Sequence, residues 1–451
     1  MKKGRESIRL GAGAGFSGDR IDPAQQLAEK GQLDYLVFEC LGERTIAANQ
    51  ARRLKDPQSG YDSLLEARMR AVLPHTTAVG TKIITNAGAA NPLAAADRIS
   101  QFAASISGET VRVAAVTGDD VLEAVRAHDP VVWETGQRLS EHSEELVSAN
   151  AYIGADSVVP ALEQDADVVI TGRLADPSLY VAPMIYEFGW DQASAALLGA
   201  GTAVGHLLEC AGQLTGGYYA DPCTKPVKNM AYLGFPFADV DPDGTGVFGK
   251  LRDSGGTLTT KTCAEQLLYE VGNPGSYLTP DVTADFTSVS FESLGDDVVE
   301  ISGATGRARP EELKVTLGFR GGWLGEGQIS YAGPRAFQRA ELGAEIVSER
   351  LRDIHGFPAD SISVEYIGAG AAFRGMHTDP SAHEVRLRVS ARLDTEESAD
   401  IVGWEVETLY TNGPAGGGGA RRSTTEVLAI RSCLIPRHLV STEVHLVEAT
   451  K

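Results

Sequence analysis

The chain has 451 residues, and a typical domain size of about 100 to 200 residues predicts two or three domains. Its formal net charge of −21 argues against a nucleic-acid partner, because such partners are bound through clustered Lys and Arg side chains. The sequence has neither an apolar run of about 18 residues nor the apolar core of a signal peptide. We therefore expect a cytoplasmic protein with no membrane contact.

The cysteines and histidines form no metal-binding pattern. The five cysteines are scattered and never spaced as CxxC, and the nine histidines form no HxxxH or HExxH motif. We predict reduced thiols and no metal site.

In the first half of the chain, short apolar segments alternate with helical stretches. The apolar segments are rich in Val and Ile without polar alternation, which is typical of parallel strands covered by helices on both faces. This pattern predicts an α/β domain over residues 1–235 with a doubly wound, largely parallel sheet. The predicted strands are 8–10, 35–39, 82–85, 112–117 and 168–171, and the predicted helices are 23–30, 46–54, 61–72, 92–107, 121–127 and 140–152.

The pattern changes after a helical stretch over residues 191–212. A passage rich in Gly and Pro follows, and we assign residues 236–280 to a connecting segment. Runs of strands with two helices then predict a second, smaller α+β domain over 281–451. Its predicted strands are 287–291, 298–302, 312–320, 328–331, 361–366, 384–393 and 425–433, its helices are 335–355 and 396–410, and the glycine cluster at 412–422 is predicted to be a surface loop.

Four apolar segments of the first half each run into a polar, glycine-bearing turn. Ligands of open α/β sheets bind at the carboxyl ends of the strands, so we expect these turns to meet in one crevice. The first turn, GAGFSG (13–18), fits the G-x-G-x-x-G pattern of NAD-binding folds. However, its helix should start only at Asp22 and Pro23, beyond the motif. We predict that Ser17 and Gly18 line a substrate site, with NAD binding and a plain tight turn as alternatives.

Polar side chains follow the next two strands. Glu39 ends an apolar strand, where burial raises the pKa of a carboxyl toward neutrality and suits it to proton transfer. Glu43 lies close by and is a further candidate for proton transfer. A surface ion pair with Arg44 is the alternative interpretation. In TNAGAANP (85–92), Asn86 is predicted to orient or polarise a carbonyl, and Asn91 to cap a helix.

Two further pairs of residues suit substrate binding and proton transfer. In TGRLADPS (171–178), Arg173 and Asp176 emerge just past a strand, where a guanidinium suits a carboxylate or phosphate. An internal ion pair that braces the loop is the alternative. His206 and Glu209 share one helical face and are predicted to share a proton or hold a water, against a purely structural histidine.

A second candidate for anion binding lies in DSGGTLTTKT (253–262). Its turn of Ser254, Gly255 and Gly256, together with Lys261, Thr262 and a helix start, is predicted to cradle a phosphate or carboxylate. The predicted capping box joins Thr262 to Glu265. A merely capped helix is the alternative.

Long segments of the sequence closely resemble the AtuA family of acyclic terpene utilisation proteins, over nearly the whole chain. They include GAGAGFSGDR, LDYLVFECLGERT, TNAGAANP, IGADSVVPALEQDADVVITGRLADPSL and HLLECAGQLTGGYYADP. The resemblance implies a cytosolic catabolic role on branched acids or their CoA esters. It also implies a small companion subunit, because longer family members carry an additional C-terminal region that other genomes encode separately.

Together these observations predict a hydratase, dehydratase or isomerase that acts on a small branched or unsaturated carboxylic acid or its CoA thioester. Glu39, with His206 or Glu209, would move the proton, while Arg173, Asn86 and the turn at 254–256 would hold the substrate. No cofactor is predicted, apart from CoA as part of the substrate, and a homo-oligomer is expected. The alternatives are a non-catalytic binding subunit of a two-component complex and an NAD-dependent oxidoreductase.

Overall fold

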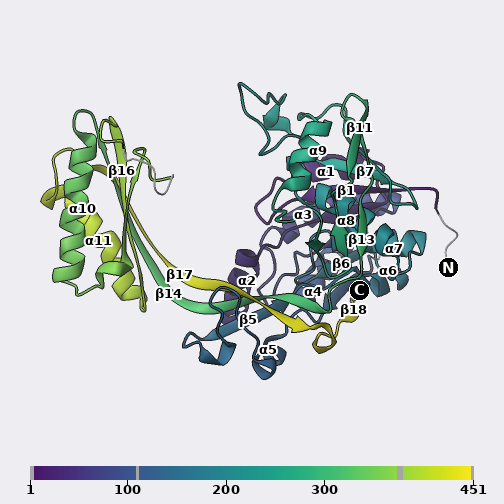
Figure 1. The fold of residues 1–451 in the computed structure, drawn as a ribbon, viewed down its shortest axis with the longest axis horizontal. Helices are drawn as coiled ribbons and strands as arrows, with labels where there is room; N and C mark the ends of the chain where they lie inside the picture. The colour runs from purple at the N-terminus through teal and green to yellow at the C-terminus, as the bar shows by residue number, and fades with distance from the viewer. Residues whose placement is uncertain (1–4, 108–110, 373–378, 448–451) are drawn as a thin grey trace. The chain divides into compact units, whose positions relative to one another are not determined.

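The computed structural model describes residues 5–107, 111–372 and 379–447 of a mixed α/β protein (Figure 1). The chain divides into two compact units: unit 1 comprises Met1–Gly318 and Ile430–Lys451, and unit 2 comprises Phe319–Ala429. Two long strands, β14 (Glu312–Ala332) and β17 (Gly418–Pro436), contribute residues to both units.

A ten-stranded sheet forms the centre of unit 1, in the order β11-β12-β8-β7-β1-β2-β3-β6-β4-β18. The five strands from β1 to β4 in this order run parallel, whereas all strands on either side of them pair antiparallel. The sheet is therefore mixed and not largely parallel as predicted. Its strands are β1 (Ile8–Ala14), β2 (Tyr35–Phe38), β3 (Lys82–Thr85), β4 (Val113–Thr117), β6 (Val168–Thr171), β7 (Pro236–Val240), β8 (Gly246–Lys250), β11 (Ser290–Gly295), β12 (Val298–Ser302) and β18 (Glu443–Val447).

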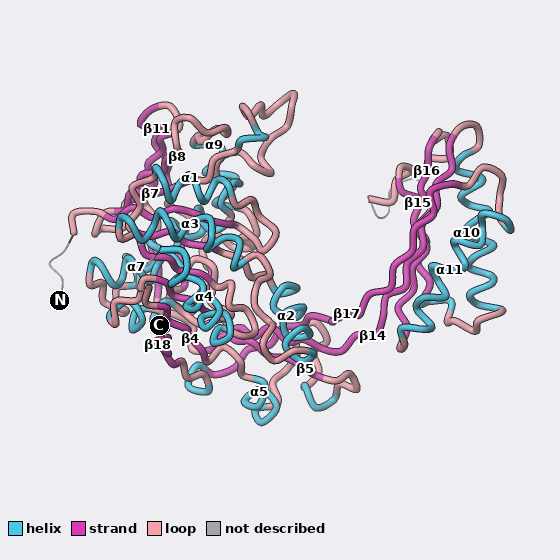
Figure 2. Tube along the Cα trace, turned by 180° about the vertical axis from the view of Figure 1, so that it is seen from behind, coloured by secondary structure: helices cyan, strands magenta, loops and turns pink. Residues whose placement is uncertain are grey.

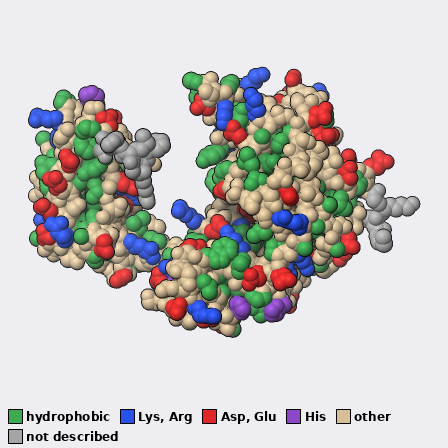
Figure 3. Space-filling model, in the orientation of Figure 1, with side chains coloured by type: hydrophobic (Ala, Val, Ile, Leu, Met, Phe, Trp, Pro, Cys, Tyr) green, Lys and Arg blue, Asp and Glu red, His purple; other side chains and the backbone are tan. Residues whose placement is uncertain are grey.

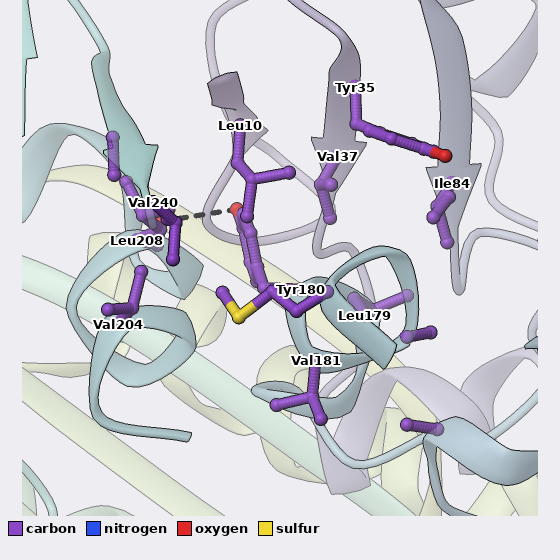
Figure 4. Close-up of a cluster of buried hydrophobic side chains, with 14 of the residues drawn as sticks. Leu10, Tyr35, Val37, Ile84, Leu179, Tyr180, Val181, Val204, Leu208 and Val240 are labelled. Atoms are coloured by element: carbon purple, nitrogen blue, oxygen red, sulfur yellow. Dashed lines mark hydrogen bonds between the residues drawn. The ribbon is translucent and has the colours of Figure 1, made fainter. Parts of the chain in front are cut away.

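Helices pack on both faces of the parallel strands, as the apolar strand pattern predicts. Alternate residues of β2 enter two separate cores: Tyr35 and Val37 enter one, and Leu36 and Phe38 the other. Figure 4 shows the first of these cores, where the Tyr180 hydroxyl donates to the Leu208 carbonyl at 3.3 Å. The first core packs against α6 (Val159–Glu163), α7 (Ser178–Phe188), α8 (Ala195–Glu209) and α9 (Thr260–Leu268), and the second against α1 (Asp22–Lys30), α3 (Leu65–Val79) and α4 (Pro92–Ser107).

Smaller elements complete unit 1. A three-stranded sheet joins β9 (Tyr277–Leu278), β10 (Thr283–Asp285) and β13 (Thr305–Arg307), and two further helices are α2 (Glu43–Lys55) and α5 (Leu122–His128). The helix predicted over 140–152 is wrong. This segment forms a short 3-10 helix, Leu139–Glu141, followed by strand β5 (Leu146–Ala151), which pairs with β14. Pairing with a strand distant in sequence here overrides the local helical pattern.

Unit 2 is a sheet with two helices on one face (Figure 2). Its strand order is β15-β16-β14-β17, and α10 (Ala336–Asp353) and α11 (Glu396–Asn412) pack against β16 (Glu384–Leu393). Strand β15 (Ile362–Ile367) lies at one edge. The side chains of β16 alternate between buried and partly exposed, as expected for a sheet covered on one side.

Strand β14 is one continuous strand of 21 residues, although two strands were predicted there. Two of the glycines between the predicted strands let α11 approach the sheet: a Cβ on Gly325 would lie 1.8 Å from the Ala399 carbonyl oxygen, and one on Gly327 would lie 2.5 Å from the Val406 Cβ. These glycines therefore serve helix packing and not a turn.

Candidate active site

A cavity of about 1100 Å³ opens in unit 1 beyond the carboxyl ends of the parallel strands. Gly15 and Phe16 line it from the loop after β1, Glu39 from the loop after β2, and Arg173 from the loop after β6. The end of α8 adds a further wall. Five of the predicted site residues therefore share one cavity: Glu39, Arg173, Asp176, His206 and Glu209.

Glu39 is a buried carboxyl held in place by its neighbours. One of its oxygens, Oε1, accepts hydrogen bonds from the Leu41 amide at 2.6 Å and from the Asn86 side chain at 3.1 Å. Burial, together with the negative charge of Asp176, raises the pKa of Glu39 to about 8, although Arg173 and both hydrogen bonds act in the opposite direction. Glu39 is thus suited to exchange a proton near neutral pH.

Asn86 does not line the cavity and lies behind Glu39. Its side-chain oxygen accepts a hydrogen bond from the Cys40 amide at 2.7 Å, which leaves its NH2 group to point at Glu39. Asn86 therefore orients the carboxyl and is a positioning residue, a different role from the predicted contact with a substrate carbonyl.

Arg173 is the main cation of the cavity, and only 2% of it is exposed. Its Nη2 donates to Asp176 at 3.0 Å, and its guanidinium lies 4.1 Å from the centre of the Tyr152 ring. Burial disfavours the charged guanidinium, but Asp176 and Tyr152 outweigh this and the pKa of Arg173 is raised. The Asp119 carboxylate accepts a hydrogen bond from the Arg173 amide at 2.8 Å and so fixes the loop.

Part of the Arg173 guanidinium is left unsatisfied. Within the described residues, its Nε and Nη1 are buried and have no hydrogen-bond partner. A buried donor without an acceptor is costly, so a structure normally retains one only where a water or a ligand completes it. The ion pair with Asp176, the alternative prediction for Arg173, is therefore present, but it uses only one of the three guanidinium nitrogens.

A second charged group of the cavity joins Glu43 to two residues that were not predicted, Tyr152 and Lys314. Glu43 Oε1 accepts hydrogen bonds from the Tyr152 hydroxyl at 2.6 Å and from Lys314 Nζ at 2.9 Å. Burial raises the pKa of Glu43, but these two donors outweigh it and lower the pKa to about 2. Glu43 is thus an ionised partner of Lys314, and no hydrogen bond or ion pair between it and Arg44 occurs among the described contacts.

His206 and Glu209 form a buried pair at the end of α8. His206 Nδ1 lies 2.7 Å from Glu209 Oε1, and its Nε2 lies 3.2 Å from the Leu267 carbonyl oxygen. Because a carbonyl can only accept, Nε2 carries a hydrogen, and the remaining proton is shared between Nδ1 and Glu209. Burial raises the pKa of Glu209 to about 7, and the other oxygen of Glu209 is unpartnered within the described chain.

The loop predicted to cradle an anion lies outside this cavity, and its amides are already used. Gly255 donates to the Tyr232 carbonyl at 2.7 Å, and Gly256 donates to that of Lys228 at 2.8 Å. The hydroxyl and amide of Ser254 both donate to the Leu251 carbonyl. These amides are consequently not directed at a ligand.

The start of α9 also differs from its prediction. The N-cap is Thr259: its hydroxyl accepts a hydrogen bond from the Thr262 amide, and the Thr262 hydroxyl accepts one from the Thr259 amide. The predicted capping box of Thr262 with Glu265 is therefore wrong. Lys261 is exposed and lines no part of the cavity. The signal for the true cap was present in the sequence, because a second Thr stands three residues earlier.

The glycine turn after β1 has a packing role. A Cβ on Gly15 would lie 2.6 Å from the Cys210 backbone, and one on Gly13 would lie 2.7 Å from the Phe38 ring. Helix α1 begins at Asp22, beyond the motif, as predicted. Ser17 and Gly18 do not line the cavity, but the Ser17 carbonyl accepts a hydrogen bond at 2.6 Å from the buried Arg68, which supports this loop.

Two structural arrangements are absent from the described residues. Within residues 5–107, 111–372 and 379–447, no group of three or more His, Cys, Asp or Glu side chains is arranged to hold a metal ion. In the same residues no helix combines the length and apolar character needed to cross a bilayer. On the face drawn in Figure 3, acidic side chains are interspersed with basic ones.

Comparison with known proteins places the chain in a family. The model of the acyclic terpene utilisation family protein AtuA matches residues 8–446, nearly the whole chain. The chain belongs to the AtuA family. No curated protein and no solved structure matches it. The AtuA family is described by its link to acyclic terpene utilisation, and the roles of individual residues must be argued from the cavity itself.

Proposed function

We propose that this AtuA protein is an acid–base enzyme, of the hydratase, dehydratase or isomerase type, that acts on a small branched or unsaturated carboxylic acid or its CoA thioester. The supporting observation is that Glu39, with a pKa raised to about 8, shares one cavity with the unsatisfied donors of Arg173. Its cytoplasmic location, homo-oligomeric state and companion subunit stay predictions.

Glu39 is the proposed general base. A carboxyl whose pKa lies near the working pH can accept a proton from carbon and release it again within one turnover. Asn86 and the Leu41 amide both hold Oε1, so Oε2 is the oxygen left for the substrate proton. Glu39 would remove the proton next to the substrate carbonyl.

Arg173 is the proposed electrophilic group. Removal of that proton places negative charge on the carbonyl or carboxylate oxygens, and a buried guanidinium aimed at them stabilises this charge. Its Nε and Nη1 are the donors available for the purpose. Tyr152 beneath the guanidinium and Asp119 at its backbone limit its movement.

The pair of His206 and Glu209 is the proposed second proton carrier. In a dehydration, the base gains the proton of the C–H bond, and a second acid gives a proton to the departing hydroxyl, which leaves as water. Glu209, with a pKa of about 7 and an unpartnered oxygen, suits this role. In an isomerisation, Glu39 would return the same proton to a different carbon, and no second acid would be needed.

The test is an assay of the purified protein, with and without its companion, on unsaturated acids and acyl-CoA thioesters. Glu39→Gln and Arg173→Ala are each expected to abolish most of the activity. Glu123→Gln is the matched control, because its side chain is 84% exposed on α5 and pairs only locally with Arg126. Unchanged activity of both cavity variants would refute this site assignment, whereas a lack of activity on every substrate tested would favour a non-catalytic binding subunit.

A further inference from the structure

The charges around the cavity restrict the class of ligand it can hold. Seven carboxyl side chains line it, against one Arg and one Lys among the described residues. Both cations already have a carboxylate partner: Arg173 lies 3.0 Å from Asp176, and Lys314 lies 2.9 Å from Glu43. The lining is therefore net acidic, and it holds no cation in excess.

The acidic character extends to the exposed part of the lining. Glu270, Glu311 and Glu312 are exposed there, and we call them the acidic rim. The nucleotide of CoA carries several phosphate charges, which proteins bind with clustered Lys and Arg or with free loop amides. No cluster of Lys and Arg is present in the described lining, and a phosphate near the acidic rim would meet repulsion.

Two independent features nevertheless provide for a single anion inside the cavity. Arg173 has two buried N–H groups without a partner in the described chain. The 13-residue helix α2 begins at the cavity, since its N-cap Gly42 and its first residue Glu43 both line it, and no side chain caps it. Amides in the first turn of a helix have no acceptor within the helix and favour negative charge.

The exposed apolar part of the lining suits a hydrocarbon chain. Phe16, Trp133 and Leu278 line the cavity with exposed fractions of 59%, 53% and 65%. Large apolar side chains left in water are expected where an apolar group binds. The cavity therefore combines one anion site with apolar walls.

We propose that the cavity takes a free monocarboxylic acid, with its carboxylate between Arg173 and the amino end of α2, and that it excludes the CoA thioester. This inference rests on the proposed function and selects one of its two substrate classes. It also excludes dicarboxylates, because a second anion would face the carboxyls of the lining.

Binding and turnover are measured separately, so that the two proposals can fail separately. Calorimetry compares a branched unsaturated acid, its CoA thioester, CoA alone and a dicarboxylate of the same length. The acid is expected to bind at least about tenfold more tightly than the other three. In Arg173→Met its affinity should fall at least about tenfold, whereas Arg112→Met, an exposed arginine paired with Asp165, should match the wild type.

Two further variants guard against misfolding and test the charge argument. If Arg173→Met does not fold, Arg173→Met with Asp176→Asn removes the unpaired carboxylate and takes its place. Changing all three residues of the acidic rim to Gln should strengthen thioester binding several-fold and leave acid binding unchanged.

The results distinguish the two proposals. A thioester that binds as tightly as the acid, with no effect of the rim variant, would overturn this inference and leave the acid–base enzyme standing. Tight, Arg173-dependent binding of the acid without any turnover would support this inference and contradict the proposed function.

Discussion

Unit 1 and unit 2 each contain a histidine paired with a buried glutamate, and the two glutamates differ in how many of their oxygens have hydrogen-bond partners. In unit 2, Glu405 accepts hydrogen bonds from Arg350 at 2.8 and 3.1 Å and from His355 at 2.6 Å. Both of its oxygens are used, and although burial raises the pKa of Glu405, these partners outweigh it and lower the pKa. In unit 1, one oxygen of Glu209 is unpartnered among the described residues and its pKa is raised.

The difference separates a structural cluster from a candidate site. A charged group whose partners all come from the protein stabilises the fold and leaves nothing for a ligand. Around the cavity, donors of Arg173 and an oxygen of Glu209 are left over, and Glu39 holds a proton that ordinary carboxyls have lost. Residue types alone would not distinguish the two clusters, whereas their hydrogen bonds do.

The largest expected effect is on the reaction itself. Glu39→Gln keeps the hydrogen bond from the Leu41 amide but removes the base, so turnover should fall by about 10² to 10⁴-fold. For an isomerisation, the wild-type kcat/KM should rise with pH through about 8, the pKa of Glu39. For a dehydration it should be bell-shaped, because Glu209, with a pKa of about 7, must also be protonated. A pH–rate profile of both proteins checks this, and a wild-type profile that is flat between pH 6 and 9 would contradict it.

Removing the arginine of each cluster should have opposite consequences. Arg173→Met should lower kcat/KM by about 10 to 100-fold, because charged donors to the reacting oxygens are lost. Arg350→Met should leave kcat/KM unchanged but reduce the free energy of unfolding, because the buried Glu405 carboxylate loses its arginine partner. Kinetics and urea unfolding of both variants would show whether the two clusters differ as described.

Glu39 and Glu405 should also make the free energy of unfolding depend on pH in opposite directions. With its pKa raised to about 8, the folded Glu39 retains a proton that the unfolded chain loses near the ordinary carboxyl value. The contribution of Glu39 to the free energy of unfolding therefore falls as pH rises from the ordinary carboxyl pKa to about 8, and it is constant above pH 8. Glu405, with a lowered pKa, stabilises the fold above the ordinary carboxyl pKa, and this contribution is lost as pH falls.

Urea titrations from pH 4 to 9 test this directly. Glu39→Gln should remove the loss of stability toward pH 8, so the variant gains on the wild type as pH rises. Glu405→Gln should instead lose most relative to the wild type above pH 5 and least at low pH. Equal pH slopes for the two variants would contradict the assigned protonation states.

A smaller effect is expected at Asn86. Its amide donates to Glu39 and helps to lower that pKa, so Asn86→Ala should move the kcat/KM profile to higher pH by up to about one unit. The maximal rate should fall only a few-fold, which is the effect expected from the loss of one hydrogen bond. A lower rate with no shift of the profile would mean that Asn86 contributes packing alone.

The smallest effect is expected at Lys261. This side chain lies outside the cavity, and the amides of the neighbouring loop are already paired. Lys261→Ala should therefore change the affinity for a carboxylate by less than about twofold. A larger loss, measured by calorimetry, would restore the anion site predicted from the sequence.

Much of the fold could be predicted from local patterns. The strands over 298–302 and 384–393 and the helix over 92–107 were predicted with the bounds of β12, β16 and α4. Their apolar periodicity and the Pro that starts α4 are local signals. The helix predicted over 140–152 and the break within β14 failed because distant partners, β14 and α11, determine those structures.

The candidate site was predictable where strand ends supplied it. Glu39, Arg173 and Asp176 follow parallel strands whose carboxyl ends must share one edge. Tyr152 and Lys314 were missed because one lay in the wrongly predicted helix and the other on a strand assigned to the second domain. The sequence also did not show that the amides of Gly255 and Gly256 donate to backbone carbonyls, so this loop was wrongly predicted to bind an anion.

Gly15 in the cavity wall lies so close to the Cys210 backbone that the absence of a side chain sets the spacing between these two segments. Even one added methyl group, as in Gly15→Ala, would push the loop after β1 away from the end of α8. This movement would widen the cavity without removing any of its polar side chains. Its capacity is thus set by a position that carries no side chain, and substrate range could be engineered there.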